Sequence, residues 1–160
     1  MSEVERFLTG WERVRHNVIQ VAKDMPESDY EFAPYEGLRT FHEQLQHILR
    51  NADVFVDCAL NGKFNLALFE LYPYKGHSRA SLLDALEKTL HLQSERLMTR
   101  AENMTTGMIR YLDGSDRPAM DILRGMKEHE IAHLNQMFLY LRAKGITPHS
   151  TRQRQAQQGH

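Results

Sequence analysis

The chain has 160 residues, a formal net charge of −1 and an isoelectric point near 6.8. A balanced charge without a basic stripe argues against nucleic-acid or anionic-membrane binding, and no apolar run approaches the roughly 18 residues that span a bilayer. Its one cysteine, Cys58, excludes an internal disulfide and a cysteine-rich zinc site, so we expect an unexported, cytoplasmic protein whose metal ligands, if any, are His, Asp or Glu.

The first part of the chain predicts two amphipathic helices. Apolar residues at helical spacing indicate a helix over residues 3–23. The segment 25–39 is broken by proline and glycine and predicts a loop. A second helix opens at Thr40 and Glu43, which have the spacing of a capping box, and it runs to about residue 60.

The second part of the chain predicts two more helices. Residues 63–77 are apolar but interrupted, which indicates a long packed crossover that lets the second and third helices run parallel. The third helix is expected over 79–102, followed by a short extended piece and a turn over 103–117. Pro118 occupies a first-turn position and starts a fourth helix that ends at Gly145.

These elements predict an all-α fold, a four-helix bundle with a long crossover between its second and third helices. The bundle domain is expected over residues 1–145. The tail over 146–160 is expected to be disordered, because from Thr147 onward it is rich in Gln and Arg and lacks large apolar residues. His149 and His160 are therefore poor ligand candidates, because nothing in a disordered tail would hold them in place.

Two histidines stand four residues apart in the fourth helix. His129 and His133 therefore leave the same helix face, with Cβ atoms about 5–6 Å apart. They continue a stripe of apolar residues that faces the interior, where polar groups need hydrogen bonds or a ligand. The pair supplies half of a metal site, although two core histidines satisfied by Gln44, Asn51 or backbone would also explain the pattern.

The segment also matches H-E-x-x-H, the zinc metalloprotease helix in which Glu130 would be the general base. No Asp or Glu follows Glu130, and Gln136 and Leu139 occupy the positions where the longer motif has Gly and His. The metalloprotease interpretation therefore fails, because the zinc site it requires would lack a third ligand. Glu130 remains a weak catalytic candidate, and a solvated surface position fits it equally because it leaves the helix about 100° from His129.

A better third ligand is His47, at the edge of the apolar face of the second helix, with His42 as a substitute or helper. Three imidazoles suit Zn²⁺, Ni²⁺ or Fe²⁺ and leave a position open for water, as catalytic sites do. Cys58 fits a small buried apolar role better than that of a nucleophile.

The sequence resembles the DinB/YfiT-like family of four-helix-bundle proteins over roughly residues 3–145. The resemblance lies in Arg39-Thr40-Phe41, in His47, and in the segment His129-Glu130-x-x-His133-x-x-Gln136. It implies that the three histidines bind a divalent metal at one end of the bundle, that the protein forms a homodimer, and that it acts on a small-molecule substrate. Some members of the family transfer a low-molecular-weight thiol such as bacillithiol or mycothiol to electrophiles, and others isomerise small acids with the help of a thiol. The resemblance therefore implies a metal-dependent enzyme such as a thiol S-transferase acting on small electrophiles, or a hydrolase-like enzyme. The alternative is a non-catalytic metal-binding or stress-related interaction protein.

Overall fold

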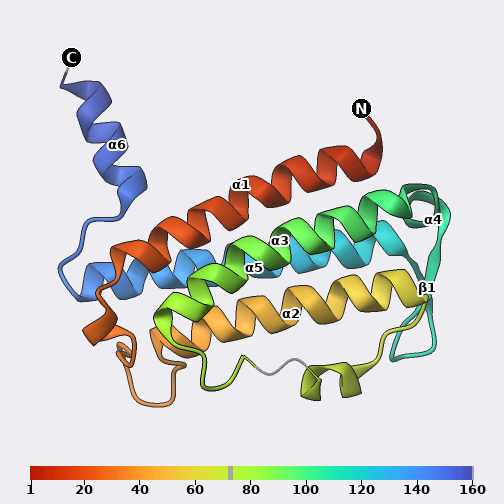
Figure 1. Cartoon of the computed structure of the whole chain (residues 1–160), viewed down its shortest axis with the longest axis horizontal. Coiled ribbons are helices and arrows are strands. Elements are labelled where there is room, and N and C mark those ends of the chain that lie inside the picture. The colour runs from red at the N-terminus through yellow and green to blue at the C-terminus, as the bar shows by residue number, and fades with distance from the viewer. Residues whose placement is uncertain (72–73, 160) are drawn as a thin grey trace.

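The computed structural model describes residues 1–71 and 74–159. Four long helices form the bundle, and their bounds are α1 (Glu3–Asp24), α2 (Phe41–Asn61), α3 (Arg79–Thr99) and α5 (Ala119–Ala143). Helices α1 and α2 each pack against both α3 and α5. The chain runs in one direction along α2 and α3 and in the opposite direction along α1 and α5 (Figure 1). The predicted all-α bundle is confirmed.

The helix boundaries follow from capping side chains. Ser2 and Thr40 each accept a hydrogen bond from the backbone amide three residues later, and Glu5 and Glu43 return one to the cap. Each reciprocal pair satisfies amides that the first helical turn leaves unpaired. Gly62 ends α2 in the left-handed region at φ 73°, a conformation that glycine adopts without a steric penalty.

The crossover joins the parallel helices α2 and α3 as expected. Tyr72 and Pro73 belong to this predicted segment and lie outside the described residues. Before them the chain forms the short 3-10 helix η2 (Leu66–Glu70), whose first turn is capped by Asn65. A second 3-10 helix, η1 (Glu27–Asp29), lies in the loop between α1 and α2.

The connection between α3 and α5 is more regular than predicted. Helix α3 ends at Thr99, and α4 (Ala101–Thr106) follows. Strands β1 (Met108–Arg110) and β2 (Asp116–Pro118) then form an antiparallel hairpin in which Ile109 is opposite Arg117. The predicted extended piece and turn are present, and the chain returns through them to the start of α5.

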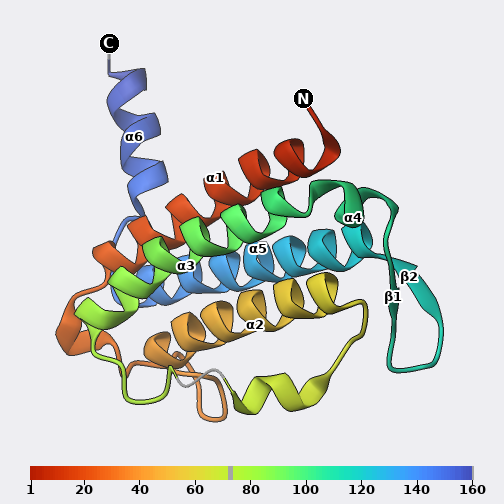
Figure 2. The ribbon, with the colours of Figure 1, turned by 45° about the vertical axis from the view of Figure 1, so that its right-hand side comes forward.

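The predicted disorder of the tail differs from the structure, in which His149–Gln158 form helix α6. This helix projects from the end of the bundle (Figures 1 and 2). Its first turn is fixed by Asp24 of α1, which accepts from the backbone amide of His149 at 2.9 Å and from the guanidinium of Arg152 at 2.8 Å. The tail has little apolar surface, so sequence composition missed a helix that polar contacts hold. His160 lies outside the described residues.

The core fills the space between the four long helices along the length of the bundle. Its fully buried side chains include Trp11, Phe41, Leu45, Leu86 and Leu123. Helix α5 contributes to both halves of this core, so its rotation about its own axis is determined by packing on two sides. Among the described residues, no helix is long and apolar enough to cross a membrane.

Candidate metal centre

Three histidines meet where α2 packs against α5. His47 comes from α2, and His129 and His133 come from successive turns of α5. The Nε2 atom of His129 lies 3.0 Å from Nε2 of His47 and 3.1 Å from Nε2 of His133. One ring nitrogen from each residue lies within 4.8 Å of the others. We call these three residues the histidine cluster; the structure brings together the three ligands predicted from the sequence.

The protonation of His133 is set by its neighbours. Its Nδ1 lies 2.7 Å from Oε1 of Gln44. The amide nitrogen of Gln44 donates to Oε1 of Gln136 at 3.1 Å and to the hydroxyl of Tyr140 at 3.2 Å, so its oxygen is free to accept. His133 therefore carries its proton on Nδ1 and presents a lone pair at Nε2, as a metal ligand must.

This arrangement fits a metal ion better than it fits three histidines alone. Because His133 presents a lone pair at Nε2, a proton on Nε2 of His129 can point at only one of the two neighbouring rings, and without that proton the lone pairs of His129 and His133 oppose each other. In a tetrahedral zinc site with Zn–N distances of about 2.0–2.1 Å, ligand nitrogens lie about 3.3 Å apart, close to the two separations measured from Nε2 of His129.

The electrostatics of the cluster keep the rings neutral. Burial is the largest cause that lowers the pKa of His47 to about 3 and that of His129 to about 4, and it also lowers the pKa of His133. The positive charge of Arg39 contributes to the lowered pKa of all three rings. Neutral imidazole is the form that coordinates metal, so the rings are ready to bind a cation at pH 7.

Glu130 faces away from the cluster, toward α1. Its carboxylate accepts from Nε of Arg15 at 2.6 Å, from Nη2 of Arg15 at 3.0 Å and from the indole nitrogen of Trp11 at 2.8 Å. The side chains of Arg15 and Glu130 are 0% and 2% exposed. The solvated position considered for Glu130 is therefore wrong, and both of its carboxylate oxygens are occupied by donors from α1.

The remaining histidines lie apart from the cluster. His42 bonds through Nε2 to the backbone oxygen of His77 at 2.6 Å and faces Glu31 through Nδ1 at 3.1 Å, so it does not replace His47. His16 is exposed on α1, and His91 is exposed beside Glu95. Of the histidines considered from the sequence, the described structure therefore gathers only the predicted three.

Two pockets open beside the cluster. One has a volume of about 320 Å³ and is lined by His47 together with Arg39, Arg50 and other polar side chains. The other, of about 780 Å³, is lined by Gln44 and Gln136, which belong to the hydrogen-bond chain behind His133, and by apolar residues of the loop before α2. A reactant could therefore approach the cluster from solvent.

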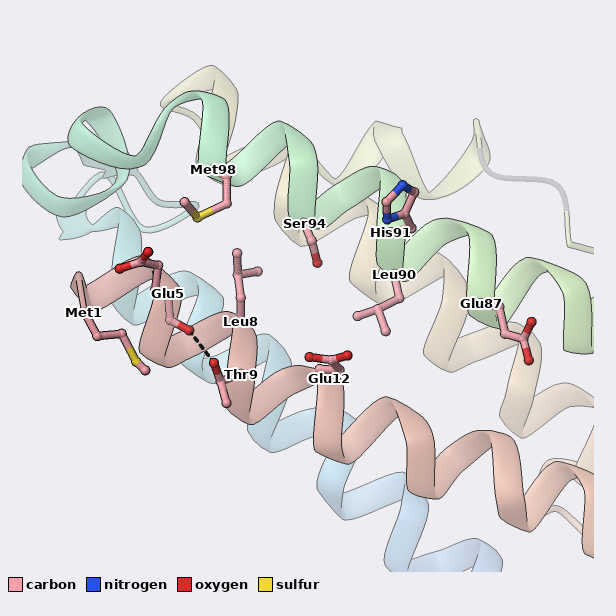
Figure 3. A pocket seen from close by; sticks show the side chains of 10 residues that line it. All are labelled: Met1, Glu5, Leu8, Thr9, Glu12, Glu87, Leu90, His91, Ser94 and Met98. Carbon is pink, nitrogen blue, oxygen red and sulfur yellow. Dashed lines mark hydrogen bonds between the residues drawn. The ribbon is translucent and has the colours of Figure 1, made fainter.

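A further groove lies between α1 and α3 (Figure 3). Its volume is about 520 Å³, and Leu8 and Leu90 point into it from the two helices. Glu5, Glu12 and Glu87 surround these leucines, and the groove is lined neither by a clustered histidine nor by the glutamines behind His133 that line the larger pocket. We therefore place the candidate site at the two pockets beside the cluster and not at this acidic groove.

Comparisons with known proteins agree with the geometry. The sequence model of the DinB superfamily matches residues 11–137, so the chain belongs to the DinB superfamily. Crystal structures of DinB-like proteins from Bacillus subtilis and Bacillus cereus have TM-scores of 0.74 and 0.73, each at 20% identity. The matches cover 89% and 90% of this chain and 94% of each neighbour. At this identity the likeness shows the fold alone. Among curated proteins, none matches this chain.

Sequence reasoning missed two features around the site. Arg15 is buried although it is charged, and its position four residues after Trp11 on the apolar stripe of α1 is the signal that indicates an inward side chain. The second feature is the basic lining beside His47, which combines α2 with segments on either side of it. Sequence spacing does not reveal that lining, because the loop conformations decide which side chains meet.

Proposed function

We propose that this protein is a metal-dependent enzyme that holds Zn²⁺, Ni²⁺ or Fe²⁺ through His47, His129 and His133 and joins a low-molecular-weight thiol, through its sulfur, to a small electrophile. The observation that carries the proposal is the convergence of three neutral imidazole nitrogens beside two open pockets. In the reaction, a sulfur–carbon bond forms while the bond from that carbon to its leaving group breaks. The thiol proton departs with the leaving group.

The chain's own residues would prepare this chemistry. Gln44 holds the proton of His133 on Nδ1, which keeps Nε2 available. Tyr140 accepts from Gln44 and donates to the backbone oxygen of Arg39 at 2.6 Å, so the orientation of the ligand is tied to the loop that borders both pockets. A divalent cation bound at the cluster would supply a Lewis acid that lowers the pKa of a thiol or of a water molecule.

The sulfur would come from a cofactor and not from the chain. Cys58 is buried, and burial raises the pKa of its thiol. Its sulfur accepts a hydrogen bond from the backbone amide of Asn65 at 3.4 Å and packs with Val54 and Phe64. A thiol with a raised pKa is a poor nucleophile at neutral pH, so Cys58 has a packing role.

The first experiment measures metal content. Protein purified without a histidine tag, then reconstituted separately with Zn²⁺, Ni²⁺ and Fe²⁺, is compared with His133→Ala and with the exposed-histidine control His16→Ala. We expect about one equivalent per chain in the wild type and in His16→Ala, and a loss in His133→Ala of at least about a hundredfold in affinity, because one of three ligands is gone. A wild type that takes up none of the three ions would refute the proposal.

A second experiment separates the enzyme from a non-catalytic metal-binding or interaction protein. Cobalt(II) replaces the native ion as a spectroscopic probe, and 2-mercaptoethanol is added. An enzyme needs an exchangeable position on the metal, so we expect the visible absorption of cobalt to change as the thiol binds. An unchanged spectrum would indicate a closed coordination shell and would favour the non-catalytic role.

A further inference from the structure

The pocket beside His47 is basic. Its lining combines Arg39 from the loop before α2, Arg50 from α2 and Lys75 from the segment before α3. The only carboxylate in the lining is Glu43, whose Oε2 already accepts the backbone amide of Thr40 at 2.8 Å in the capping box. Three cationic side chains therefore face a volume of about 320 Å³ with one carboxylate among them.

These positive charges are not neutralised within the described part of the chain. Across residues 1–71 and 74–159, Arg39, Arg50 and Lys75 form no ion pair with Asp or Glu. The Nε atom of Arg50 is buried and lacks a hydrogen-bond acceptor there. The guanidinium of Arg50 lies against Phe69, 5.9 Å from the ring centroid, which restricts its orientation.

Arg39 also borders the larger pocket of about 780 Å³. That pocket has exposed apolar walls, in which Tyr35 is 77%, Leu38 49% and Leu139 66% exposed. The hydroxyl of Tyr140 bonds to the backbone oxygen of Arg39 and so fixes the point at which the two pockets meet. A single small molecule that contacts Arg39 can therefore place a charged group on one side and an apolar group on the other.

Arg39 and His47 line the same pocket, so the positive charge of Arg39 lies beside the histidine cluster. A divalent cation at the cluster and a guanidinium nearby repel each other. An anion between them would be attracted to both. Guanidinium groups bind carboxylate and phosphate oxygens through paired, charge-assisted hydrogen bonds, which are stronger than neutral ones.

We infer that the pocket binds the oxyanion of a small organic molecule, a carboxylate or phosphate group held by Arg39, Arg50 and Lys75, while the apolar part of that molecule lies against Tyr35 and Leu139. The assignment of this molecule as the substrate rests on the proposed function, whereas the binding of the anion does not. The substrate class is thus a small amphiphilic acid, and neutral electrophiles are disfavoured.

The test compares an acid with its neutral counterpart. Metal-free and zinc-loaded full-length protein are titrated with 3-phenylpropanoate, with 3-phenylpropanamide and with inorganic phosphate, and binding is followed by isothermal calorimetry and by NMR shifts. We expect the acid to bind about tenfold or more tightly than the amide, and to weaken as salt is added. Inorganic phosphate should compete with the acid if the charged group alone is recognised.

Matched variants locate the effect. Arg50→Gln and the exposed Arg39→Gln should each weaken binding of the acid by about tenfold. Arg13→Gln removes the same charge from the exposed surface of α1 and should change it by less than about twofold. Urea unfolding of each variant checks that the bundle is intact, and Arg39→Gln provides the test if Arg50→Gln does not fold.

Equal binding of acid and amide, or equal weakening by Arg13→Gln and Arg50→Gln, would overturn the inference. The two proposals fail separately. A protein that binds one metal ion but does not distinguish acid from amide keeps the metal centre and loses the anion pocket. A protein that takes up no metal but prefers the acid through Arg39 and Arg50 keeps the anion pocket and loses the proposed enzyme.

Discussion

Two polar clusters lie on different sides of α5, and two adjacent residues of this helix each belong to one of them. We call Glu130, Arg15 and Trp11 the α1 cluster; the other is the histidine cluster. Glu130 turns toward α1 and meets Arg15 and Trp11, whereas His129 turns toward α2 and meets the other two histidines. In the α1 cluster both carboxylate oxygens are bonded, and the guanidinium also donates to the backbone oxygen of Leu86 at 3.1 Å. In the histidine cluster, by contrast, the Nε2 atoms of the three rings contact only one another among the described residues.

The difference distinguishes a polar cluster that stabilises the fold from one that is arranged to bind a ligand. A buried ion pair whose hydrogen bonds are all made is a closed unit, and removing one partner leaves an unpaired charge in an apolar interior. The histidine cluster has lone pairs converging on one point and two pockets beside it. The ion pair with α1 and the core packing act on α5 together, and in the resulting rotation the two histidines of α5 face α2.

The largest expected effect comes from breaking the ion pair of the α1 cluster. Glu130→Leu leaves the guanidinium of Arg15 buried and unpaired, so we expect the free energy of unfolding to fall by about 3–5 kcal/mol. Urea unfolding of the metal-free protein measures it. Glu128→Leu, on the exposed face of the same helix, is the control and should change stability by less than about 0.5 kcal/mol.

A variant that removes both charges of the ion pair tests the same explanation. In the double variant Arg15→Met with Glu130→Leu, both charges are gone and apolar side chains of similar volume replace them, so most of the lost stability should return. If Glu130→Leu alone lowers the free energy of unfolding no more than its exposed control does, the α1 cluster does not stabilise the fold, and the contrast between the two clusters is wrong.

The next largest effect concerns the histidine cluster, and the substitution that tests it leaves the fold intact. Gln44→Met preserves side-chain length but removes the acceptor that orients His133, so we expect metal affinity to fall about 10–100-fold, as for other losses of a ligand's hydrogen-bond partner. A competition titration with a coloured zinc chelator measures it, with the exposed Gln20→Met as control. Unchanged affinity in Gln44→Met would show that the chain through Tyr140 does not orient the ligand.

Much of this contrast follows from local sequence. The spacing of His129 and His133 places both rings on one face whatever the tertiary structure is, and the capping box at Thr40 sets the start of α2 and thereby the turn on which His47 stands. The four long helices are predictable for the same reason, because their apolar stripes and caps are local patterns. The position of His47 at the edge of the apolar face of α2 made it the third candidate, and the family resemblance, confirmed by the superfamily match, implied the same set.

The rest depends on contacts between distant segments. Glu130 lies 115 positions from Arg15, and nothing in its own helix shows that an ion pair buries it. His42 and His47 are both on α2, and only the loop conformation assigns His42 to the backbone of His77. Helix α6 depends on Asp24 at the far end of α1. Polar contacts of this kind have no periodicity that a sequence pattern could reveal.

The smallest expected effect tests whether the histidine cluster contributes to the stability of the metal-free protein. Because the folded-state pKa of His129, about 4, is below its ordinary value of 6.5, the unfolded chain binds more protons in this interval, and stability should fall as pH drops from 6.5 to 4. His129→Ala in metal-free protein should flatten this dependence by on the order of 1 kcal/mol, a value reduced for partial exposure of the ring. Unfolding in urea at pH 7 and at pH 4.5 measures the difference, and His16→Ala, which removes an exposed ring, should leave the slope unchanged. A steeper slope in His129→Ala than in the wild type would mean that the cluster stabilises the acid form, and that it is closed in the same sense as the pair on α1.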